Sequence, residues 1–109
     1  MHNAHAVEAL SALANEHRLA IYRLLVQAGP HGRPAGAIAD KLNLPASSLS
    51  FHLAHLTRAG LIEQRRESRS LIYSADFGAM NGLVGFLTDN CCGGKSCAPA
   101  AAPSRRKAS

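Results

Sequence analysis

The fold of this chain is decided by residues 45–74, which read PASSLSFHLAHLTRAGLIEQRRESRSLIYS. Apolar residues recur at i, i+4 and i+7 in the first part of this stretch: Leu49, Leu53 and Leu56. This spacing predicts an amphipathic helix, because it places the three side chains on one helical face. The chain then breaks at Gly60, and two short apolar–polar runs at 61–65 and 70–74 predict a β-hairpin.

The polar side of this helix and the hairpin beside it have the chemistry of a DNA-binding surface. Hydroxyl, imidazole and guanidinium groups can contact base edges or phosphates, and a helix fits the major groove. A solvated helix or a hydrophilic hairpin would explain each feature singly, but their order and spacing favour a winged helix-turn-helix. The residues expected to bind DNA are Ser47, Ser48, Ser50, Phe51, His52, His55, Arg58, Arg65, Arg66 and Arg69.

Helical patterns flank this stretch on both sides, so we expect a mainly α fold with a β-hairpin wing. The further helices are predicted at about residues 7–14, 16–28, 34–42 and 77–89. Asn15 and Asp76 are good caps for the second and the last of these, and Pro34 suits a first helical turn. Leu19, Ile21, Tyr22 and Leu25 are expected to face inward in the second helix. The last helix has an apolar stripe of Phe77, Met80, Val84 and Leu87.

Size, charge and composition limit the class of protein. A chain of 109 residues forms at most one domain, and its formal net charge of +5 suits a polyanionic partner. No apolar run approaches the roughly 20 residues that span a membrane, and the N-terminus lacks the pattern of a signal peptide. We therefore expect a cytoplasmic protein with no membrane partner. Its acidic and histidine residues form no catalytic pattern, so an enzyme is not expected.

The most specific pattern is Ser50-x-His52-Leu53-x-x-Leu56-x-x-Ala59-Gly60-Leu61-Ile62, followed by Arg66-x-x-Arg69-x-x-x-Tyr73. This pattern resembles the ArsR/SmtB family of metal(loid)-responsive bacterial repressors, in particular its arsenic-responsive branch. The resemblance runs from about residue 8 to residue 88. It implies a winged helix-turn-helix homodimer that binds an inverted-repeat operator DNA and is released by an inducer.

In the resembled family the first and last helices form the dimer, so residues 1–90 are expected to be a DNA-binding and dimerisation domain. From Cys91 onward the chain is mostly Gly, Ala, Pro, Ser and Lys without periodicity, which predicts a flexible tail at 91–109. The last helix contains three glycines, each of which lowers helix stability: Gly78, Gly82 and Gly85. Close packing against a helix across the dimer explains them better than sequence variation on an unconstrained surface. The residues implied at the interface are Val7, Leu10, Leu13, Met80, Val84 and Leu87.

The three cysteines all lie within seven residues, at Cys91, Cys92 and Cys97. Thiolates select soft ions, and three of them on a glycine-containing loop suit three-coordinate As(III) or Sb(III) as an inducer. Structural zinc usually has four ligands, but His2 or His5 could supply the fourth, which leaves zinc, cadmium and lead as alternatives. A reactive tail that binds no metal is the remaining interpretation.

The chain departs from the family pattern at three places. Arsenic-responsive members often carry Cys-x-Cys on the helix before the recognition helix, and residues 35–39 contain no cysteine. Ser68 stands where the hairpin turn commonly has glycine, which suggests a strained turn or another turn type. Phe51 stands where a polar, base-reading residue is common, so it either touches a thymine methyl group or is simply an exposed aromatic residue.

Three functions remain open at the level of the sequence. The first is a dimeric repressor that leaves its operator when As(III) or Sb(III) binds the cysteines. The second is the same repressor responding to a divalent soft metal or to thiol redox state. The third is a thiol metal carrier with no role on DNA, which the arginines of the hairpin disfavour.

Overall fold

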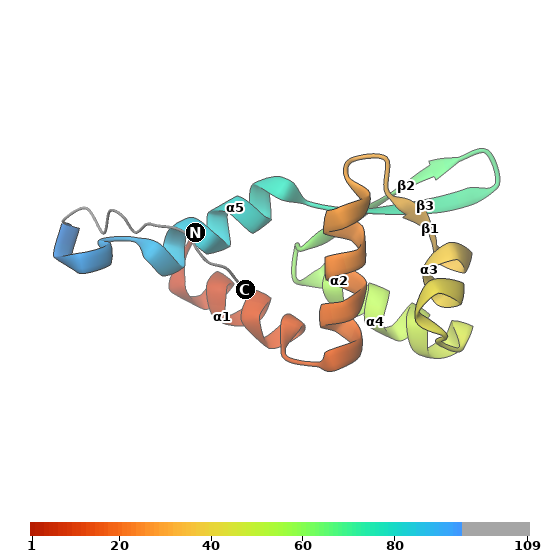
Figure 1. Ribbon diagram of the computed structural model, residues 1–109, viewed down its shortest axis with the longest axis horizontal. Helices are drawn as coiled ribbons and strands as arrows, with labels where there is room; N and C mark the ends of the chain where they lie inside the picture. Colours follow the sequence, from red (N-terminus) through yellow and green to blue (C-terminus); the bar gives the residue numbers. More distant parts are fainter. Residues whose placement is uncertain (95–109) are drawn as a thin grey trace.

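The structure is a computed structural model and describes residues 1–94. Within these residues the chain folds into five α-helices and a small antiparallel sheet (Figure 1). The elements in chain order are α1 (Asn3–Leu13), α2 (Glu16–Ala28), β1 (Arg33–Pro34), α3 (Ala35–Leu42), α4 (Ala46–Arg58), β2 (Ile62–Glu67), β3 (Ser70–Ala75), α5 (Phe77–Thr88) and a 3₁₀ turn (Cys91–Gly94). The expected winged helix-turn-helix is confirmed.

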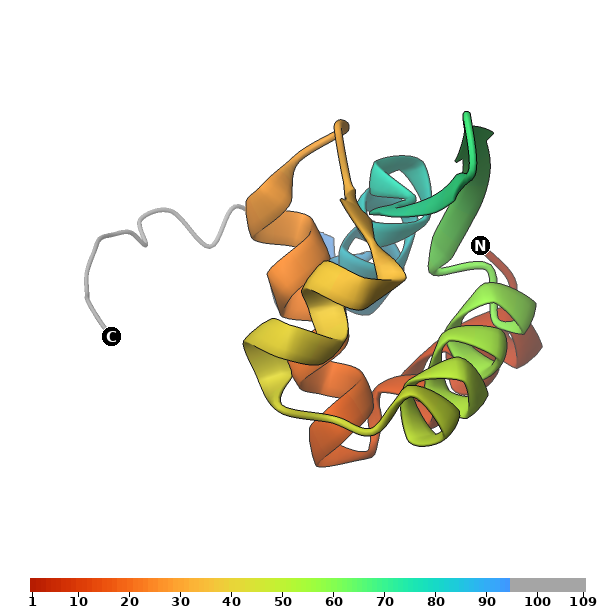
Figure 2. The ribbon, with the colours of Figure 1, turned by 90° about the vertical axis from the view of Figure 1, so that its right-hand side faces the viewer.

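The helix-turn-helix consists of α3, a three-residue turn and α4. Asn43 ends α3 in the left-handed conformation, with φ of 55°, and Leu44 N–H donates to the carbonyl of Ala39 at 3.0 Å. This is a common way to close a helix, because it satisfies carbonyls that the last turn leaves without partners. Pro45 is extended and starts α4. The turn thus changes the chain direction between the two helices and leaves α4 packed against α3 at the lower edge of the molecule in Figure 2.

The wing is a hairpin of β2 and β3 inside a three-stranded sheet of order β1-β3-β2. Pairing of Gln64 with Tyr73 sets the hairpin register, and Ser68 takes the first place of the two-residue turn with φ of 56°. A positive φ costs a residue with a Cβ roughly 1–2 kcal/mol, so the serine expected to strain this turn does adopt a strained conformation.

Strand β1 was not predicted, and the third helix begins one residue later than expected. Pro34 pairs with Ile72 of β3 instead of opening the helix. A two-residue edge strand has no periodicity to detect, and proline is tolerated at a sheet edge. Gly32 makes this pairing possible, because its φ is +69° and a Cβ there would collide with the carbonyl oxygen of Tyr73.

Both predicted helix caps are confirmed. The side chain of Asn15 accepts hydrogen bonds from the N–H groups of His17 and Arg18, at 2.9 and 3.1 Å. Asp76 accepts from the N–H of Ala79 at 3.0 Å and so caps α5. Each cap satisfies N–H groups that a first helical turn leaves without partners. These two side chains therefore fix where α2 and α5 begin.

The core lies between α1, α2, α3 and α4 and against the base of the wing. The predicted stripe of α4 is buried, with Leu49, Leu53 and Leu56 each no more than 3% exposed. The first helix differs from the prediction, because it buries three alanines instead of its larger residues: Ala6, Ala9 and Ala12. Leu19 was expected inward but is 44% exposed, whereas Ile21 and Leu25 are fully buried.

The last helix packs beside α1 at the end of the molecule opposite the wing (Figure 1). Only Leu83 is buried in α5, while Phe77 and Met80 are half-buried. Val84 and Leu87 of the predicted apolar stripe are 55% and 57% exposed. Together with Val7 and Leu10 of α1 they face outward within one protomer. Among residues 1–94, no helix has the length and apolarity to cross a bilayer.

Candidate nucleic-acid interface

The exposed side of α4 faces away from the core along its whole length. Its residues are Ser47, Ser50, Phe51, Ala54, Thr57 and Arg58. Ser48 and His55 are half-buried and lie at one flank of this face. The structure therefore keeps most of the predicted helix residues on one surface and adds Ala54 and Thr57, which were not predicted.

His52 is a correction to the predicted DNA-binding set. Its side chain is buried, and its Nδ1 lies 3.5 Å from Nη1 of Arg18, whose Nε donates to the carbonyl of Ala12 at 2.6 Å. Burial and the nearby Arg18 hold the pKa of His52 below its ordinary value, with smaller contributions from His17 and His55. The imidazole therefore packs α4 against α2 and has little surface left for DNA.

Phe51 is the most exposed large apolar side chain in the structure, at 63%. Its ring meets the rings of His52 and His55 edge-on, with centroid separations of 5.6 and 6.5 Å. Burial, Arg18 and Arg58 lower the pKa of His55, although Glu8 opposes this shift. The phenyl ring thus has an imidazole neighbour at His52 and at His55 and still exposes most of its surface.

Arg65, a predicted DNA contact, is exposed but makes its hydrogen bonds within the protein. Its Nε pairs with Glu67 Oε2 at 2.7 Å. Its Nη2 donates to the carbonyl of His31 at 2.8 Å, and Nη1 to that of Pro30 at 3.4 Å. All three nitrogens thus have acceptors within the protein, and Arg65 ties the wing to the loop between α2 and β1.

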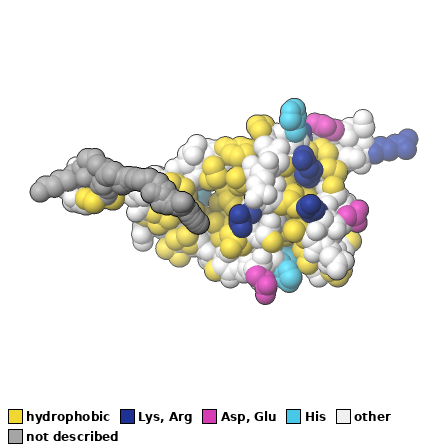
Figure 3. Space-filling view, viewed as in Figure 1, with side chains coloured by type: hydrophobic (Ala, Val, Ile, Leu, Met, Phe, Trp, Pro, Cys, Tyr) yellow, Lys and Arg dark blue, Asp and Glu magenta, His cyan; other side chains and the backbone are white. Residues whose placement is uncertain are grey.

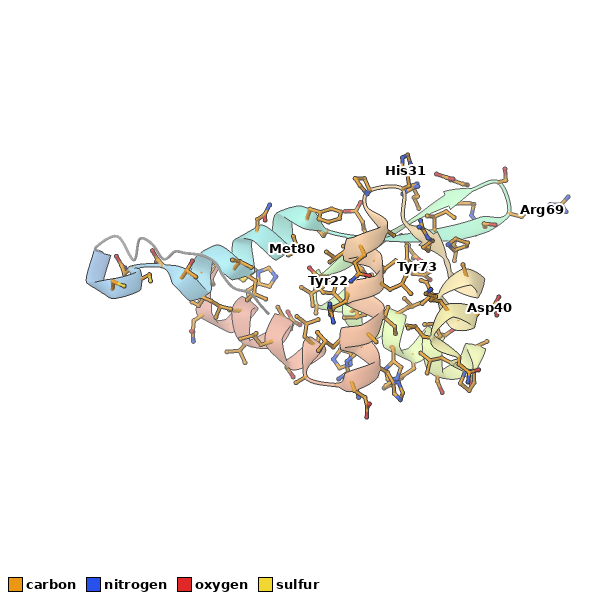
Figure 4. All side chains as sticks on the ribbon, viewed as in Figure 1. Tyr22, His31, Asp40, Arg69, Tyr73 and Met80 are labelled. Carbon is orange, nitrogen blue, oxygen red and sulfur yellow. The ribbon has the colours of Figure 1, made fainter. Side chains whose placement is uncertain are left out.

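Arg66 and Arg69 keep the place that the sequence predicted. Arg66 pairs with Leu71 in the hairpin register, so its side chain leaves the sheet on the face opposite Arg65. Arg69 follows Ser68 in the turn and extends outward from the hairpin tip (Figure 4). Both side chains are exposed and can reach a phosphate backbone beside α4.

A groove of about 340 Å³ separates α4 from the wing. It is lined by Ser50, Leu53, Ala54, Thr57, Arg58, Gln64 and Tyr73. Gln64 and Tyr73 are cross-strand partners, which places them on the same face of the hairpin as Arg66. Neither was predicted as a site residue. Gln64 and Arg66 are two residues apart in β2, and this spacing in the sequence could have indicated that they share a face of the hairpin.

Further basic residues lie on the side of the molecule formed by α2 and α3. Figure 3 shows separate dark-blue side chains across this side and one at the far tip of the wing. Arg23, Arg33 and Lys41 line two shallow grooves there, of about 250 and 290 Å³. Asp40 lies close by on α3 (Figure 4), so this side is less purely basic than the wing.

The residues implied at a dimer interface share one exposed surface over α1 and α5. Val7, Leu10, Val84 and Leu87 are between 42% and 58% exposed, and Leu13 and Met80 are half-buried. At Gly85, an added Cβ would meet nothing within 4 Å inside the protomer. Close helix packing at this glycine therefore requires another molecule, and the assignment stays a prediction.

The first two cysteines lie exposed just beyond α5. The Sγ atoms of Cys91 and Cys92 are 3.7 Å apart. Cys92 and Gly93 have φ of 57° and 67°, which turns the chain sharply after the helix. Cys97 lies outside the described residues, as does most of the predicted tail. Within residues 1–94, no three His, Cys, Asp or Glu side chains are grouped closely enough to hold a metal.

Comparison with known proteins identifies regulators of transcription. A family of helix-turn-helix domains matches residues 13–65. The transcriptional activator HlyU of Vibrio cholerae is 34% identical over 85 residues, which cover 78% of this chain and 76% of HlyU. The nodulation protein NolR of Rhizobium meliloti is 38% identical over 80 residues, which cover 73% of this chain but only 63% of NolR.

Solved structures agree with these relatives. HlyU of Vibrio cholerae superimposes with a TM-score of 0.66 at 33% identity, over 84% of this chain and 99% of HlyU; a structure of reduced HlyU gives 0.62 at 36%, over 79% and 90%. The homodimeric winged helix-turn-helix DNA-binding domain of a possible ArsR-family regulator from Mycobacterium bovis gives 0.63 at 29% identity, over 84% of this chain and 85% of that domain.

Proposed function

Because the chain belongs to the ArsR/SmtB family of winged helix-turn-helix transcriptional regulators, we propose that it is a homodimeric repressor that binds an inverted-repeat operator. DNA binding and regulation of transcription follow from the family; repression and the operator's symmetry are the proposal. The observation that carries it is the exposed face of α4 beside a groove and a wing with Arg66 and Arg69. A two-fold dimer presents two such faces, which match two half-sites about one helical turn apart.

We further propose that Cys91, Cys92 and Cys97 of each protomer bind As(III) or Sb(III), and that binding releases the DNA. Thiolates are soft ligands and select soft ions. The Sγ atoms of Cys91 and Cys92 lie 3.7 Å apart, so two sulfurs already meet beyond the end of α5. When bound, a soft ion would hold the three sulfurs together at the end of α5.

The position of the cysteines supports a route from inducer to DNA. They follow directly on α5, whose outward residues Val84 and Leu87 we assign to the dimer interface. A shift at the end of α5 would change how the two protomers meet, and with it the spacing of the two α4 helices. Such coupling between two binding events is typically about 1–3 kcal/mol, which changes affinity by roughly 5- to 150-fold.

Response to thiol redox state is the second candidate for the same cysteines. The short distance between Cys91 and Cys92 favours it, and a reduced form of the relative HlyU has been solved. Divalent soft metals stay an alternative to arsenite as the inducer, because His2 and His5 are exposed and could supply a fourth ligand. A metal carrier without a role on DNA is disfavoured, because the relatives are named transcriptional regulators.

One experiment tests the proposal in two steps. A duplex selected by the protein from a random-sequence library is labelled, and its binding is followed by fluorescence anisotropy. We expect two protomers per duplex, and release when arsenite is added. The double substitution Cys91→Ser, Cys92→Ser should bind DNA as before and no longer respond.

Three results would contradict parts of this assignment. Failure to enrich any sequence would refute operator binding. Release of the double-serine variant by arsenite would place the sensor elsewhere. Release of the wild type by zinc, cadmium or a mild oxidant at lower concentration than arsenite would transfer the sensing role to that agent.

A further inference from the structure

The exposed face of α4 lacks the side chains that read purines by paired hydrogen bonds. Arginine or lysine reads guanine, and asparagine or glutamine reads adenine, through two bonds to one base. None of these residues occurs in α4 before Arg58, the last residue of the helix. The three turns that would enter the major groove first carry serine, alanine and phenylalanine on their exposed side.

Phe51 dominates this surface by size and by exposure. It is 63% exposed, and the rings of His52 and His55 meet it edge-on from the helix. Ala54 lies three residues later on the same exposed side. The hydroxyl of Thr57 donates to the carbonyl of Leu53 at 2.7 Å, so this side chain too directs its polar group back to the helix.

The major groove offers one apolar group for such a surface, the 5-methyl group of thymine. We propose that Phe51 and Ala54 read thymine methyl groups, and that Phe51 determines the sequence preference of each half-site. This inference rests on the DNA-binding function proposed above and names the chemistry of the half-site. Ser47 and Ser50 flank the apolar pair and can bond to any base, so they add affinity without setting the preference.

The test removes the methyl groups from the DNA and leaves the protein unchanged. The probe is the duplex selected from the random-sequence library, prepared once with thymine and once with deoxyuridine at every thymine of the half-sites. Binding of both duplexes is measured for the wild type, for Phe51→Ser and for the control Arg66→Ala. Phe51 is exposed, so the variant is expected to fold, and circular dichroism checks that it keeps its helices.

We expect the wild type to bind the deoxyuridine duplex about fourfold more weakly for each methyl group that leaves contact, since a methyl-sized apolar group contributes about this factor on burial. Phe51→Ser should lose the part of this preference that Phe51 provides and keep at most the contribution of Ala54, about fourfold. Arg66→Ala should weaken binding to both by the same factor and keep the preference for thymine.

Equal binding of the two duplexes by the wild type would overturn the inference and leave DNA binding intact. So would a thymine preference that Phe51→Ser retains in full. If the library yields no enriched duplex, the proposed operator binding fails first and this inference fails with it. The substitution in the DNA makes the first of these outcomes independent of how any variant folds.

Discussion

Neighbouring arginines of the wing have different roles because strand residues alternate between two faces. Arg65 lies on the face toward the α2–β1 loop, where the carbonyls of Pro30 and His31 accept its hydrogen bonds. Arg66 lies on the face toward the groove and α4. One arginine positions the wing, and the other is placed to contact phosphate.

Arg65→Ala and Arg66→Ala should therefore weaken DNA binding in distinguishable ways. Loss of Arg66 removes about one phosphate contact, so the slope of log Kd against log salt should become shallower by about 1. Loss of Arg65 should loosen the wing, lower affinity at every salt concentration and leave the slope unchanged. Anisotropy titrations from low to high salt measure both quantities. Identical slopes for the two variants would contradict this division of roles.

His52 should make the folded state sensitive to acid. Its pKa in the folded protein is lowered by burial and by Arg18, with His17 and His55 adding to the effect, whereas an unfolded histidine titrates near 6.5. Above pH 6.5 both states are neutral and the stabilisation is complete. Below it the unfolded state takes up the proton first, so the free energy of unfolding falls as the pH drops toward the folded-state pKa.

Urea unfolding between pH 8 and pH 5 measures this loss. His52→Gln should flatten the dependence relative to the wild type. His31→Gln is the matched control, because His31 is exposed in the loop after α2 (Figure 4). His55, whose pKa is also lowered, should account for part of the slope that remains. If His52→Gln and His31→Gln behave alike, burial of His52 does not govern acid sensitivity.

At the scale of the element, α5 combines a strong start with a weak interior. Asp76 caps its first turn, yet the helix contains three glycines, which lower its intrinsic stability: Gly78, Gly82 and Gly85. The methyl end of Met1 lies 3.6 Å from the place of a Cβ at Gly82, so this glycine already has a neighbour within the protomer. Gly85 has no such neighbour within the protomer, so we expect a helix of the second protomer to approach it closely.

Gly85→Ala separates local helix stability from association. Alanine should favour the helix by about 1 kcal/mol, but a methyl group at a close helix crossing should weaken the dimer. Sedimentation at several concentrations measures dissociation, and circular dichroism measures helix content. Gly36→Ala is the matched control, since it also meets nothing within 4 Å but lies on α3, away from the implied interface. A variant that dimerises as well as the wild type would exclude close packing at Gly85.

At the scale of the whole molecule, the DNA-binding surface and the outward apolar residues occupy opposite ends. Helix α4 and the wing form one end, while α1 and α5 form the other (Figure 1). Surface apolar residues gathered on paired elements typically mark an interaction surface. The arrangement lets a dimer form at one end and present two recognition helices at the other.

Val84→Asp should abolish the dimer and, with it, tight binding to the operator. A carboxylate at this position would be buried without a partner across the interface, which is strongly destabilising. Val84 is 55% exposed within one protomer, so the protomer itself should stay folded. Sedimentation checks the oligomeric state, and circular dichroism checks the fold. A Val84→Asp protein that remains a dimer would remove Val84 from the interface.

Local patterns in the sequence predicted a large part of this molecule. The leucine stripe of α4, the caps Asn15 and Asp76 and the order of helix, turn and hairpin were all predicted correctly. Each depends on residues within a few positions of one another, so the physical cause is contained in the local sequence. The outward face of α4 follows from the same periodicity, because burying one stripe exposes the opposite one.

Contacts between distant segments decided the rest. Arg65 donates to carbonyls 34 and 35 residues away in the sequence. His52 is buried beside Arg18, which is 34 residues away. Helix α1 buries alanines because α2 and α4 approach it closely, which its own pattern does not indicate. The sequence by itself determined the helices, the hairpin and the chemistry that they carry, whereas β1 depends on pairing with β3. Only the tertiary structure decided which polar side chains are used inside the protein, because that depends on acceptors and charges brought together by folding.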